Sequence, residues 1–365
     1  MRKILFHLNS MEKGGAERVV SILSGQFYKN GYEVVLATEW TGKDEYELCD
    51  GVRRVHVGLD GERGRLRNFI YRVRRLRKTI EEERPDVVVA FAKKAIYRAL
   101  LATYGTGVPV ILSVRTSPEG TYDHSLDRIL IPLLYRRAAG AVFQTEVARD
   151  FFPPKLGVRS AVILNPIKDC YLDRTPPVRR KKEVVQVGRL DQFKDQIVLL
   201  EAMYRVHKQY PDYVLRIYGG DSGDGTKEKL EASIAAHGAG GYIYLMGSVE
   251  HPEEYIEDAA VFVLSSWLEG MPNALMEAMS LGLPVVATDC SGGGPATLIQ
   301  NEKNGLLVPV KNAEAMAEGI SYMIQNADRA EQMGQQAKKI GEQARETVVF
   351  AAWRDYIEER IGRAK

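Results

Sequence analysis

Several features that mark other protein classes are scarce or missing in this sequence. Its three cysteines, Cys49, Cys170 and Cys290, are isolated from one another and form neither a disulfide framework nor a metal-ligand spacing. No apolar run reaches the roughly 18 residues of a membrane-spanning helix, and the run that follows Met1 is too short for a signal peptide. We therefore expect a globular protein of a reducing, cytoplasmic compartment.

The composition is that of a folded chain with an uneven distribution of charge. A length of 365 residues suggests two domains, and 45% hydrophobic with 27% charged residues is ordinary for a globular protein. The net charge of +2 conceals an asymmetry, since residues 1–172 contain 28 Lys and Arg against 20 Asp and Glu, and the remainder contains 22 against 28. The basic first half predicts a partner with negative charge, such as an anionic membrane surface or a phosphorylated acceptor.

The most informative stretch is residues 264–279, where a strand, a loop and a helix are expected to follow one another. The apolar run 259–264 is typical of a buried parallel strand, and Asn273 stands where a helix N-cap belongs. The N–H groups at such a helix start attract anions. Glu269 and Glu277 flank this position, and an ionised glutamate can accept hydrogen bonds from two sugar hydroxyls. The pattern predicts a sugar nucleotide as ligand, although an ordinary strand-loop-helix unit with solvated glutamates would share it.

This stretch resembles the signature of the retaining GT-B glycosyltransferases of family 4. Seven residues separate the two glutamates, Gly-Met-Pro-Asn lies between them, and Gly-Leu-Pro-Val-Val-Ala-Thr begins at Gly282. The resemblance implies an α/β protein with two doubly wound parallel-sheet, Rossmann-like domains and an active site in the cleft between them. It also implies that Glu277 holds the ribose hydroxyls and Glu269 the sugar hydroxyls. The neighbouring residues expected to bind the donor are Gly270, Met271, Pro272, Asn273 and Ala274.

The rest of the chain has the strand-and-helix alternation of doubly wound parallel sheets. Apolar runs that we expect to form strands lie at 3–8, 34–38, 52–59, 86–91, 108–114, 141–144, 183–187, 213–218 and 242–250. We predict a first, acceptor-side domain over 1–172, a proline-containing basic linker over 173–182, and a second, donor-binding domain over 183–348. Residues 349–365 are expected to form a helix that packs back toward the first domain.

Two segments of the first domain contain candidate site residues. Gly14 and Gly15 open the helix expected after the first strand and resemble the family's glycine loop, which faces the donor phosphate and the acceptor; a tight turn is the alternative. The Gly-x-Gly-x-x-Gly spacing of dinucleotide-binding proteins is absent. After the fifth strand, Arg115 stands where many family members have a histidine that contacts the donor sugar. Because arginine stays charged, Arg115 is expected to bind a phosphate or carboxylate on the acceptor side and not to transfer protons.

The segment after the strand at 183–187 predicts a diphosphate site. Gly188 permits a sharp turn, and Arg189 and Lys194 place two cations at the carboxyl end of this strand, where they would neutralise a leaving diphosphate. The segment resembles the family's Gly-Arg-Leu…Lys clamp, although Asp195 stands where glycine is common. A solvated basic surface is the alternative.

Two further features concern the base and the membrane. The resemblance places Met246 and Val249 beside the nucleotide base. Residues 62–80 combine an apolar stripe at helical spacing with many arginines, so we expect this helix to lie on an anionic membrane surface. A plain surface helix that packs its stripe on the sheet is the alternative, and both can hold. Nucleic acid is not an expected partner, because no set of stacking aromatics accompanies the arginines.

These features predict a retaining glycosyltransferase that moves a hexose or N-acetylhexosamine from a nucleotide sugar at the inner membrane face. Uracil is the expected base, with GDP donors as the competitor; the expected acceptor is lipid-linked or a polysaccharide, and a soluble acceptor also fits. Glu269, Arg189 and Lys194 are the predicted catalytic residues. Because the protein supplies the cations and has no Asp-x-Asp unit, no metal and no cofactor are expected. A sugar-nucleotide epimerase of GT-B fold and a catalytically silent nucleotide-sugar binding module remain alternatives.

Overall fold

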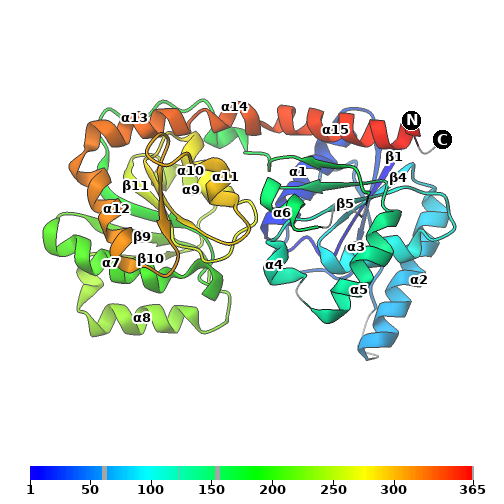
Figure 1. Ribbon diagram of the computed structural model, residues 1–365, viewed down its shortest axis with the longest axis horizontal. Helices are drawn as coiled ribbons and strands as arrows, with labels where there is room; N and C mark the ends of the chain where they lie inside the picture. Colours follow the sequence, from blue (N-terminus) through cyan, green and yellow to red (C-terminus); the bar gives the residue numbers. More distant parts are fainter. Residues whose placement is uncertain (60–63, 123, 153–156, 364–365) are drawn as a thin grey trace. The chain divides into compact units, whose positions relative to one another are not determined.

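The computed structural model describes residues 1–59, 64–122, 124–152 and 157–363. The chain forms two compact units: unit 1 comprises Met1–Pro166 and Glu346–Lys365, and unit 2 comprises Ile167–Arg345. The chain therefore leaves unit 1 and returns to it with its last helix (Figure 1). The predicted boundaries differ from these, because residues 167–182 belong to unit 2. The backbone N–H of Ile167 donates to the carbonyl of Ala344 at 2.8 Å, which ties the start of unit 2 to its end.

Unit 1 contains a seven-stranded parallel sheet in the order β3-β2-β1-β4-β5-β6-β7. Its inner strands are nearly continuous apolar runs, as expected where helices cover both faces of a sheet, whereas the edge strand β3 contains two arginines and a histidine. The chain order reverses between the neighbouring strands β1 and β4. The strands are β1 (Lys3–Leu8), β2 (Glu33–Thr38), β3 (Arg53–His56), β4 (Val87–Phe91), β5 (Val110–Ser113), β6 (Gly140–Phe143) and β7 (Ser160–Val162).

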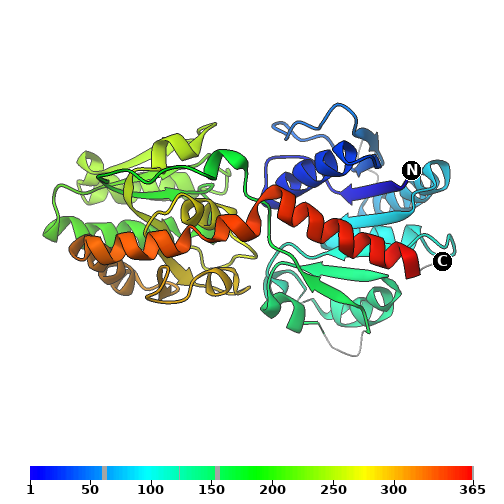
Figure 2. The same ribbon diagram turned by 90° about the horizontal axis from the view of Figure 1, so that it is seen from above.

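Helices α2, α3 and α5 cover one face of this sheet, and α1 and α15 cover the other (Figure 1). Helix α15 lies beside α1 over the sheet (Figure 2). The helices of unit 1 are α1 (Gly15–Lys29), α2 (Arg65–Glu83), α3 (Lys93–Ala102), α4 (Pro118–Thr121), α5 (Ser125–Leu134), α6 (Glu146–Asp150) and α15 (Glu346–Arg363), with a 3-10 turn, η1 (Tyr135–Arg137), after α5.

Helix α15 completes the core of unit 1. Trp353 is fully buried and stacks on Phe91 with ring centroids 5.9 Å apart, and the Tyr356 hydroxyl accepts a hydrogen bond from the N–H of Ala141 at 2.9 Å. The helix begins at Glu346, three residues before the predicted start. Its packing within unit 1 agrees with the expectation that the last helix returns to the first domain.

Helix α2 corresponds to the predicted basic stretch 62–80, of which residues 62–63 lie outside the described residues. Leu76 and Ile80 are buried against the sheet, whereas Leu66 and Ile70 near the start of the helix are exposed. The apolar stripe thus packs on the sheet only in its second half.

Unit 2 contains a six-stranded parallel sheet in the order β10-β9-β8-β11-β12-β13. The chain order reverses between the neighbouring strands β8 and β11. The strands are β8 (Lys181–Val187), β9 (Val214–Tyr218), β10 (Ile243–Gly247), β11 (Ala259–Leu264), β12 (Val285–Asp289) and β13 (Leu306–Pro309). Strand β8 thus begins inside the predicted linker.

Helices surround the second sheet, and α7, α8 and α12 share one apolar core with it. The helices of unit 2 are α7 (Gln196–Gln209), α8 (Thr226–Ala236), α9 (Pro252–Ile256), α10 (Asn273–Ser280), α11 (Gly294–Leu298), α12 (Ala313–Gln325), α13 (Ala327–Ala337) and α14 (Ile340–Ala344), with 3-10 turns η3 (Asp169–Tyr171), η4 (Gln192–Lys194) and η5 (Ala239–Gly241). Within the described ranges of both units, no helix combines the length and apolar character needed to cross a membrane.

Candidate active site

The candidate site lies at the carboxyl ends of β8, β11 and β12. Strands β8 and β11 are neighbours in the sheet, although β9 and β10 separate them in the sequence. In open parallel sheets, the crevice beyond such a reversal of strand order is where ligands bind. The loops that leave these strand ends, residues 188–195, 265–272 and 290–293, contain seven of the predicted site residues: Gly188, Arg189, Lys194, Glu269, Gly270, Met271 and Pro272.

An ion pair joins the loop after β8 to the loop after β11. The Nζ atom of Lys194 donates to Oε1 of Glu269 at 2.5 Å, and Oγ of Ser266 donates to the same oxygen at 2.7 Å. The hydroxyl of Ser265 donates to the carbonyl of Lys194 at 2.7 Å, so the two loops also touch through the backbone. The structure therefore brings together one predicted cation and one predicted glutamate.

A short 3-10 turn positions Lys194. The Asp191 carboxylate accepts hydrogen bonds from the N–H groups of Phe193 at 2.9 Å and Lys194 at 3.2 Å, and so caps η4. The sequence analysis missed Asp191 and Ser266, although an aspartate two and three residues before these N–H groups is a known turn signal. Asp195 adopts a left-handed conformation (φ 47°, ψ 45°), which explains why glycine suits this position in similar sequences.

Two glycines allow the first loop to adopt its path. A Cβ atom on Gly188 would lie 3.5 Å from Cε of Lys194, so the lysine stem already packs at contact distance over Gly188. A Cβ atom on Gly219 would lie only 1.9 Å from the Gly188 carbonyl oxygen, so β9 can approach the loop only with glycine there.

Arg189 stands apart from the ion pair within the described part of the chain. Its side chain is 66% exposed, against 22% for Lys194, and its guanidinium lies 3.5 Å from the Asp191 carboxylate. The two predicted cations thus follow the same strand but lie in different environments. Lys194 is enclosed by the second loop, and Arg189 is open to solvent.

Helix α10 begins directly after the second loop, and its start differs from the prediction. The N-cap residue is Pro272 and not Asn273, because the N–H of Met276 bonds to the Pro272 carbonyl at 3.2 Å and closes the first turn there. Asn273 is the first helical residue. The side chain of the N-cap residue, Pro272, makes no capping hydrogen bond to the first turn. The first turn therefore presents backbone N–H groups and the positive end of the helix dipole at the carboxyl end of β11.

The loop after β12 packs closely on this helix start. A Cβ atom on Gly294 would lie 1.9 Å from the Gly270 carbonyl oxygen and 2.7 Å from Cδ of Pro272. The N–H of Glu269 also donates to the carbonyl of Ser291 at 3.1 Å. These contacts fix the backbone from Glu269 to Pro272.

The predicted donor-binding residues of this segment lie together around the start of α10. Glu277 and Met271 are buried, and Asn273 and Ala274 are half-buried. Burial, with a smaller contribution from Glu269, raises the pKa of the neighbouring Cys290 thiol to about 12. The thiol is therefore neutral at physiological pH. The roles predicted for the two glutamates stay predictions.

Met246 and Val249 lie at the edge of the same sheet. They belong to the end of β10 and the turn after it, two strands away from β8. Met246 is exposed and Val249 half-buried, and the sulfur of Met246 lies 3.6 Å from Nη1 of Arg216. Contact with the nucleotide base stays a prediction.

In unit 1, Gly14 and Gly15 lie where β1 leads into α1, at the point where the strand order of that sheet reverses. Gly14 occupies the N-cap with an extended backbone, and Gly15 is the first helical residue. A Cβ atom on Gly14 would lie 2.5 Å from the Glu17 carboxylate, the end of a flexible side chain that could turn away. Their role toward a donor phosphate or acceptor stays a prediction.

Arg115 is buried within unit 1. Its Nε atom donates to the Ser113 hydroxyl and its Nη1 atom to Oδ1 of Asn165, each at 2.7 Å, and its guanidinium lies 5.3 Å from the ring centroids of both Phe91 and Trp353. Burial lowers the pKa of Arg115 to about 9. These contacts give the side chain a packing role between the strand ends and α15, and the predicted acceptor contact stays a prediction.

The sequence analysis also missed a buried charged cluster at the carboxyl ends of β1 and β2. The Glu39 carboxylate pairs with the guanidinium groups of Arg98 and, at 3.2 Å, Arg72, and it lies 3.7 Å from Nε2 of His7. The His7 Nδ1 atom lies 2.9 Å from the carbonyl of Ala37. Burial lowers the pKa of His7 to about 4 and raises the pKa of Glu39. The arginines lie on α2 and α3, so the cluster fastens both helices to the sheet.

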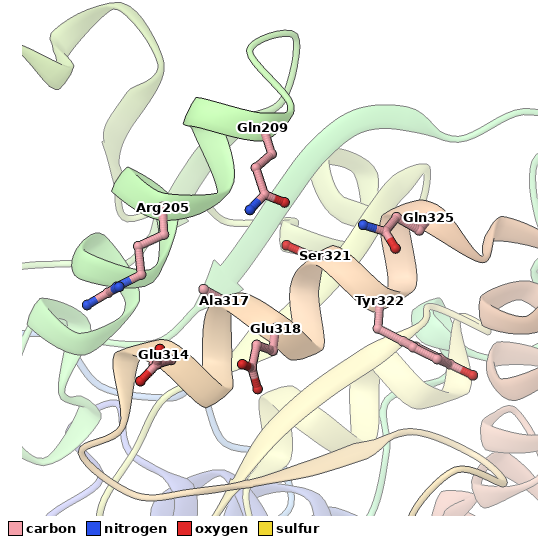
Figure 3. Close-up of a pocket in the computed structure, with 8 residues that line it drawn as sticks. All are labelled: Arg205, Gln209, Glu314, Ala317, Glu318, Ser321, Tyr322 and Gln325. Atoms are coloured by element: carbon pink, nitrogen blue, oxygen red, sulfur yellow. The ribbon is translucent and has the colours of Figure 1, made fainter.

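Unit 2 also has a groove away from these loops. This groove of about 450 Å³ lies between α7 and α12, and its lining includes Arg205, Glu314 and Tyr322 (Figure 3). None of the predicted site residues lines it. Across the described residues, no three His, Cys, Asp or Glu side chains are grouped as metal ligands.

Comparisons with known proteins agree with this geometry. The family models described as "Glycosyltransferase Family 4" and "Glycosyl transferases group 1" match residues 13–169 and 172–340. An uncharacterized glycosyltransferase of Haemophilus influenzae is 23% identical over 98% of this chain and 100% of its own length. An α-1,4-N-acetyl-D-galactosaminyltransferase of Campylobacter jejuni, named for a diphospho-undecaprenol-linked saccharide, is 23% identical over 93% of each chain. The crystal structure of Anabaena HepE in complex with UDP has a TM-score of 0.81 at 16% identity, covering 98% of this chain and all of that one. The predicted GT-B fold is confirmed, and the chain belongs to the group 1/family 4 glycosyltransferases.

Proposed function

We propose that this glycosyltransferase moves a hexose or N-acetylhexosamine from a UDP-linked sugar to a lipid-linked saccharide or a growing polysaccharide, with retention of anomeric configuration. The observation that carries the proposal is the Lys194–Glu269 pair, which lies where the strand order reverses and directly before the start of α10. The Campylobacter relative, named for transfer to a diphospho-undecaprenol-linked saccharide, supports the acceptor class. HepE in complex with UDP supports the nucleotide.

The reaction requires stabilisation of a departing diphosphate. As the bond between the anomeric carbon and the diphosphate breaks, negative charge grows on the phosphate oxygens, and preorganised cations and N–H groups lower the barrier. Lys194, Arg189 and the first N–H groups of α10 supply such groups at one end of the sheet. We propose that they suffice without a metal ion and that no cofactor takes part.

The two glutamates would hold the sugars on either side of the diphosphate. Glu277 would accept hydrogen bonds from the ribose hydroxyls and Glu269 from hydroxyls of the transferred sugar. In a front-face reaction, the acceptor oxygen bonds to the anomeric carbon on the side that the diphosphate leaves, and its proton passes to the departing phosphate oxygen. Retention follows from this same-side replacement.

A lipid-linked acceptor would reach the enzyme at a membrane surface. Helix α2 contains seven basic residues between Arg65 and Ile80 and three glutamates, residues 81–83, at its C-terminal end, where Arg77 and Lys78 pair with Glu81 and Glu82. Each basic side chain near an anionic leaflet contributes roughly 1 kcal/mol to attraction. We therefore propose peripheral binding of unit 1 to the cytoplasmic face of the membrane, where a lipid-linked acceptor would be presented.

Thermal unfolding with UDP, GDP, ADP and dTDP, each at millimolar concentration with and without EDTA, tests the donor site. A selective rise in melting temperature with UDP that survives EDTA supports the proposal, since binding to the native state raises stability. Incubation of the matching UDP-sugars with a lipid-linked saccharide, followed by NMR of the product's anomeric proton, tests transfer and retention. No shift with any nucleotide would contradict the donor site. Conversion of the UDP-sugar without acceptor would instead indicate an epimerase, and binding without turnover a silent module.

A further inference from the structure

Helix α5 of unit 1 presents an apolar row to solvent. Leu126, Ile129 and Leu133 are 68%, 65% and 58% exposed, and their spacing of three and four residues places them on one side of the helix. Surface helices normally show polar residues on this side. Contiguous apolar side chains on a surface mark an interaction site more often than isolated ones do. We call these three residues the α5 apolar row.

The opposite side of α5 already meets the core of unit 1. Ile131 and Leu134 are buried against the sheet, and the helix is anchored by Asp127, whose carboxylate pairs with Lys93 and accepts a hydrogen bond from the Tyr97 hydroxyl at 2.9 Å. The helix is therefore apolar on both sides and held rigidly in place. The α5 apolar row is not needed for packing within the described part of unit 1.

The exposed charges along helix α5 and the turn after it have one sign. The only acidic residue between Ser125 and Arg137 is Asp127, which is buried, while Arg128, Arg136 and Arg137 are exposed. The surface facing a partner is thus apolar with a basic border.

Helix α2 and the 3-10 turn η1 after α5 both contact Tyr104, an exposed aromatic residue. The carbonyl of Tyr104 accepts a hydrogen bond from Nη1 of Arg77 at 2.8 Å, and the Tyr104 ring lies 4.3 Å from the Arg137 guanidinium. Both helices lie on the same face of the sheet with α3 between them (Figure 1). The basic surface of α2 and the α5 apolar row therefore belong to one face of unit 1.

We propose that the α5 apolar row inserts into the interface of an anionic lipid bilayer while the arginines of α2 and α5 bind the lipid head groups. This inference rests on the proposed lipid-linked acceptor and adds the element that enters the membrane. Apolar side chains with a basic border are the composition of helices that lie in the bilayer interface. A second copy of the chain fits the observations less well, because two such basic borders would repel each other.

Vesicle sedimentation tests the inference with two variants. The first is the triple variant Leu126→Ser/Ile129→Ser/Leu133→Ser, and the second is Arg67→Glu/Arg74→Glu on α2. On vesicles of phosphatidylcholine with phosphatidylglycerol, the triple variant should bind at least about tenfold more weakly than the wild type at both low and high salt, since apolar insertion is not screened. The α2 variant should lose affinity mainly at low salt. Equal binding of the wild type and the triple variant would overturn the inference.

Direct evidence of insertion comes from two single variants that leave the rest of the row in place. Tryptophan fluorescence of Ile129→Trp should be quenched by lipids brominated in the acyl chains, whereas Val178→Trp, at a fully exposed position of unit 2, should not be quenched beyond the wild type. Quenching that is equal in both would contradict insertion of α5.

Two controls separate this inference from the proposed function. If the wild type binds UDP but no vesicles, the membrane inference fails while the donor site stands; if it binds vesicles but no nucleotide, the reverse holds. Sedimentation equilibrium in the absence of lipid examines self-association. A wild-type dimer that the triple variant abolishes would overturn the bilayer in favour of a second copy.

Discussion

The Nζ atom of Lys194 lies 2.5 Å from Oε1 of Glu269, so the cation proposed for the diphosphate is paired with the carboxylate proposed for the sugar. Both side chains are largely enclosed, with 22% and 12% exposure. Donor binding would therefore exchange this ion pair for two contacts, one from Lys194 to phosphate and one from Glu269 to a sugar hydroxyl. Ser266 would keep Glu269 in position during the exchange, because its hydroxyl donates to the same carboxylate oxygen.

Glu269→Gln should reduce kcat/KM at least about thirtyfold, which corresponds to a loss of about 2 kcal/mol of transition-state stabilisation. The amide keeps the shape of the side chain but neither pairs with Lys194 nor accepts two hydroxyls as a carboxylate does. Steady-state transfer assays measure the effect, with Glu254→Gln on the surface of the same unit as control. Near wild-type turnover of Glu269→Gln would remove Glu269 from the mechanism.

The two cations should differ in how salt affects them. Arg189 is mostly exposed, so its attraction to UDP should be screened, and Arg189→Met should flatten the dependence of the dissociation constant on ionic strength. Lys194 is enclosed, and Lys194→Met should weaken UDP binding roughly tenfold or more at every salt concentration. Calorimetric titration between low and high salt makes the comparison. Identical salt slopes for the two variants would contradict the difference in environment.

Gly294→Ala should weaken UDP binding, because it displaces the backbone of the loop before α10. The added methyl group would meet the Gly270 carbonyl at 1.9 Å, so the loop before α10 must move, and overpacking of this kind costs roughly 1–3 kcal/mol. We expect a lower melting temperature and a smaller shift with UDP. Gly240→Ala, where a Cβ meets nothing within 4 Å, is the matched control. An unchanged UDP-induced shift in Gly294→Ala would show that the close contact of the two loops is not needed for binding.

His7 should make stability depend on pH. Burial lowers its pKa from 6.5 to about 4, so between these values the unfolded chain binds a proton that the folded chain does not. The contribution is fully present above about pH 6.5 and is lost as the pH falls toward 4, by at most about 3 kcal/mol. Glu39, whose pKa burial raises, acts in the opposite direction.

Denaturant titrations at several pH values compare the wild type with His7→Gln, which should show a shallower loss of unfolding free energy between pH 6.5 and 4. The exposed His124→Gln is the control. Parallel curves for the wild type and His7→Gln would contradict a buried, neutral His7.

Much of the fold could be predicted because parallel strands buried on both faces are continuous apolar runs. Residues 3–8 and 259–264 form β1 and β11 over the predicted ranges. The third strand is shorter than predicted, with only residues 53–56 in the ladder at the sheet edge. Boundaries set by tertiary contacts were missed: the predicted linker lies in unit 2 because Arg180 donates to carbonyls of Ala259 and Gly282.

The parts of the candidate site that depend on local backbone structure could be predicted from the sequence. The side-chain contacts between segments that are distant in the sequence could not. The start of α10 follows from local sequence to within one residue, since Pro272 and not Asn273 is the N-cap, and the turn capped by Asp191 that positions Lys194 is also local. The pairing of Lys194 with Glu269, 75 residues later, depends on which strands are neighbours. The burial of Arg115 depends on Trp353, which lies far away in the sequence. The cluster around Glu39 was missed because its arginines come from two helices, α2 and α3, whose sequences do not show that they meet at the end of the same strand.

The return of the chain to unit 1 affects the order in which the protein is completed during synthesis. Residues 1–166 emerge from the ribosome without Trp353 and Ile357, which fill the core beside α1, whereas unit 2 is continuous and contains all its own strands. Domains that are continuous in sequence usually fold in the order in which they emerge. Here we expect the second unit to resist protease first on ribosome-stalled chains, while unit 1 becomes protected only after α15 is released. Protection of a nascent chain stalled before residue 346 in both units alike would contradict this order. The second unit would then be complete before the first, and the docking of α15 on unit 1 would be the last step of biogenesis.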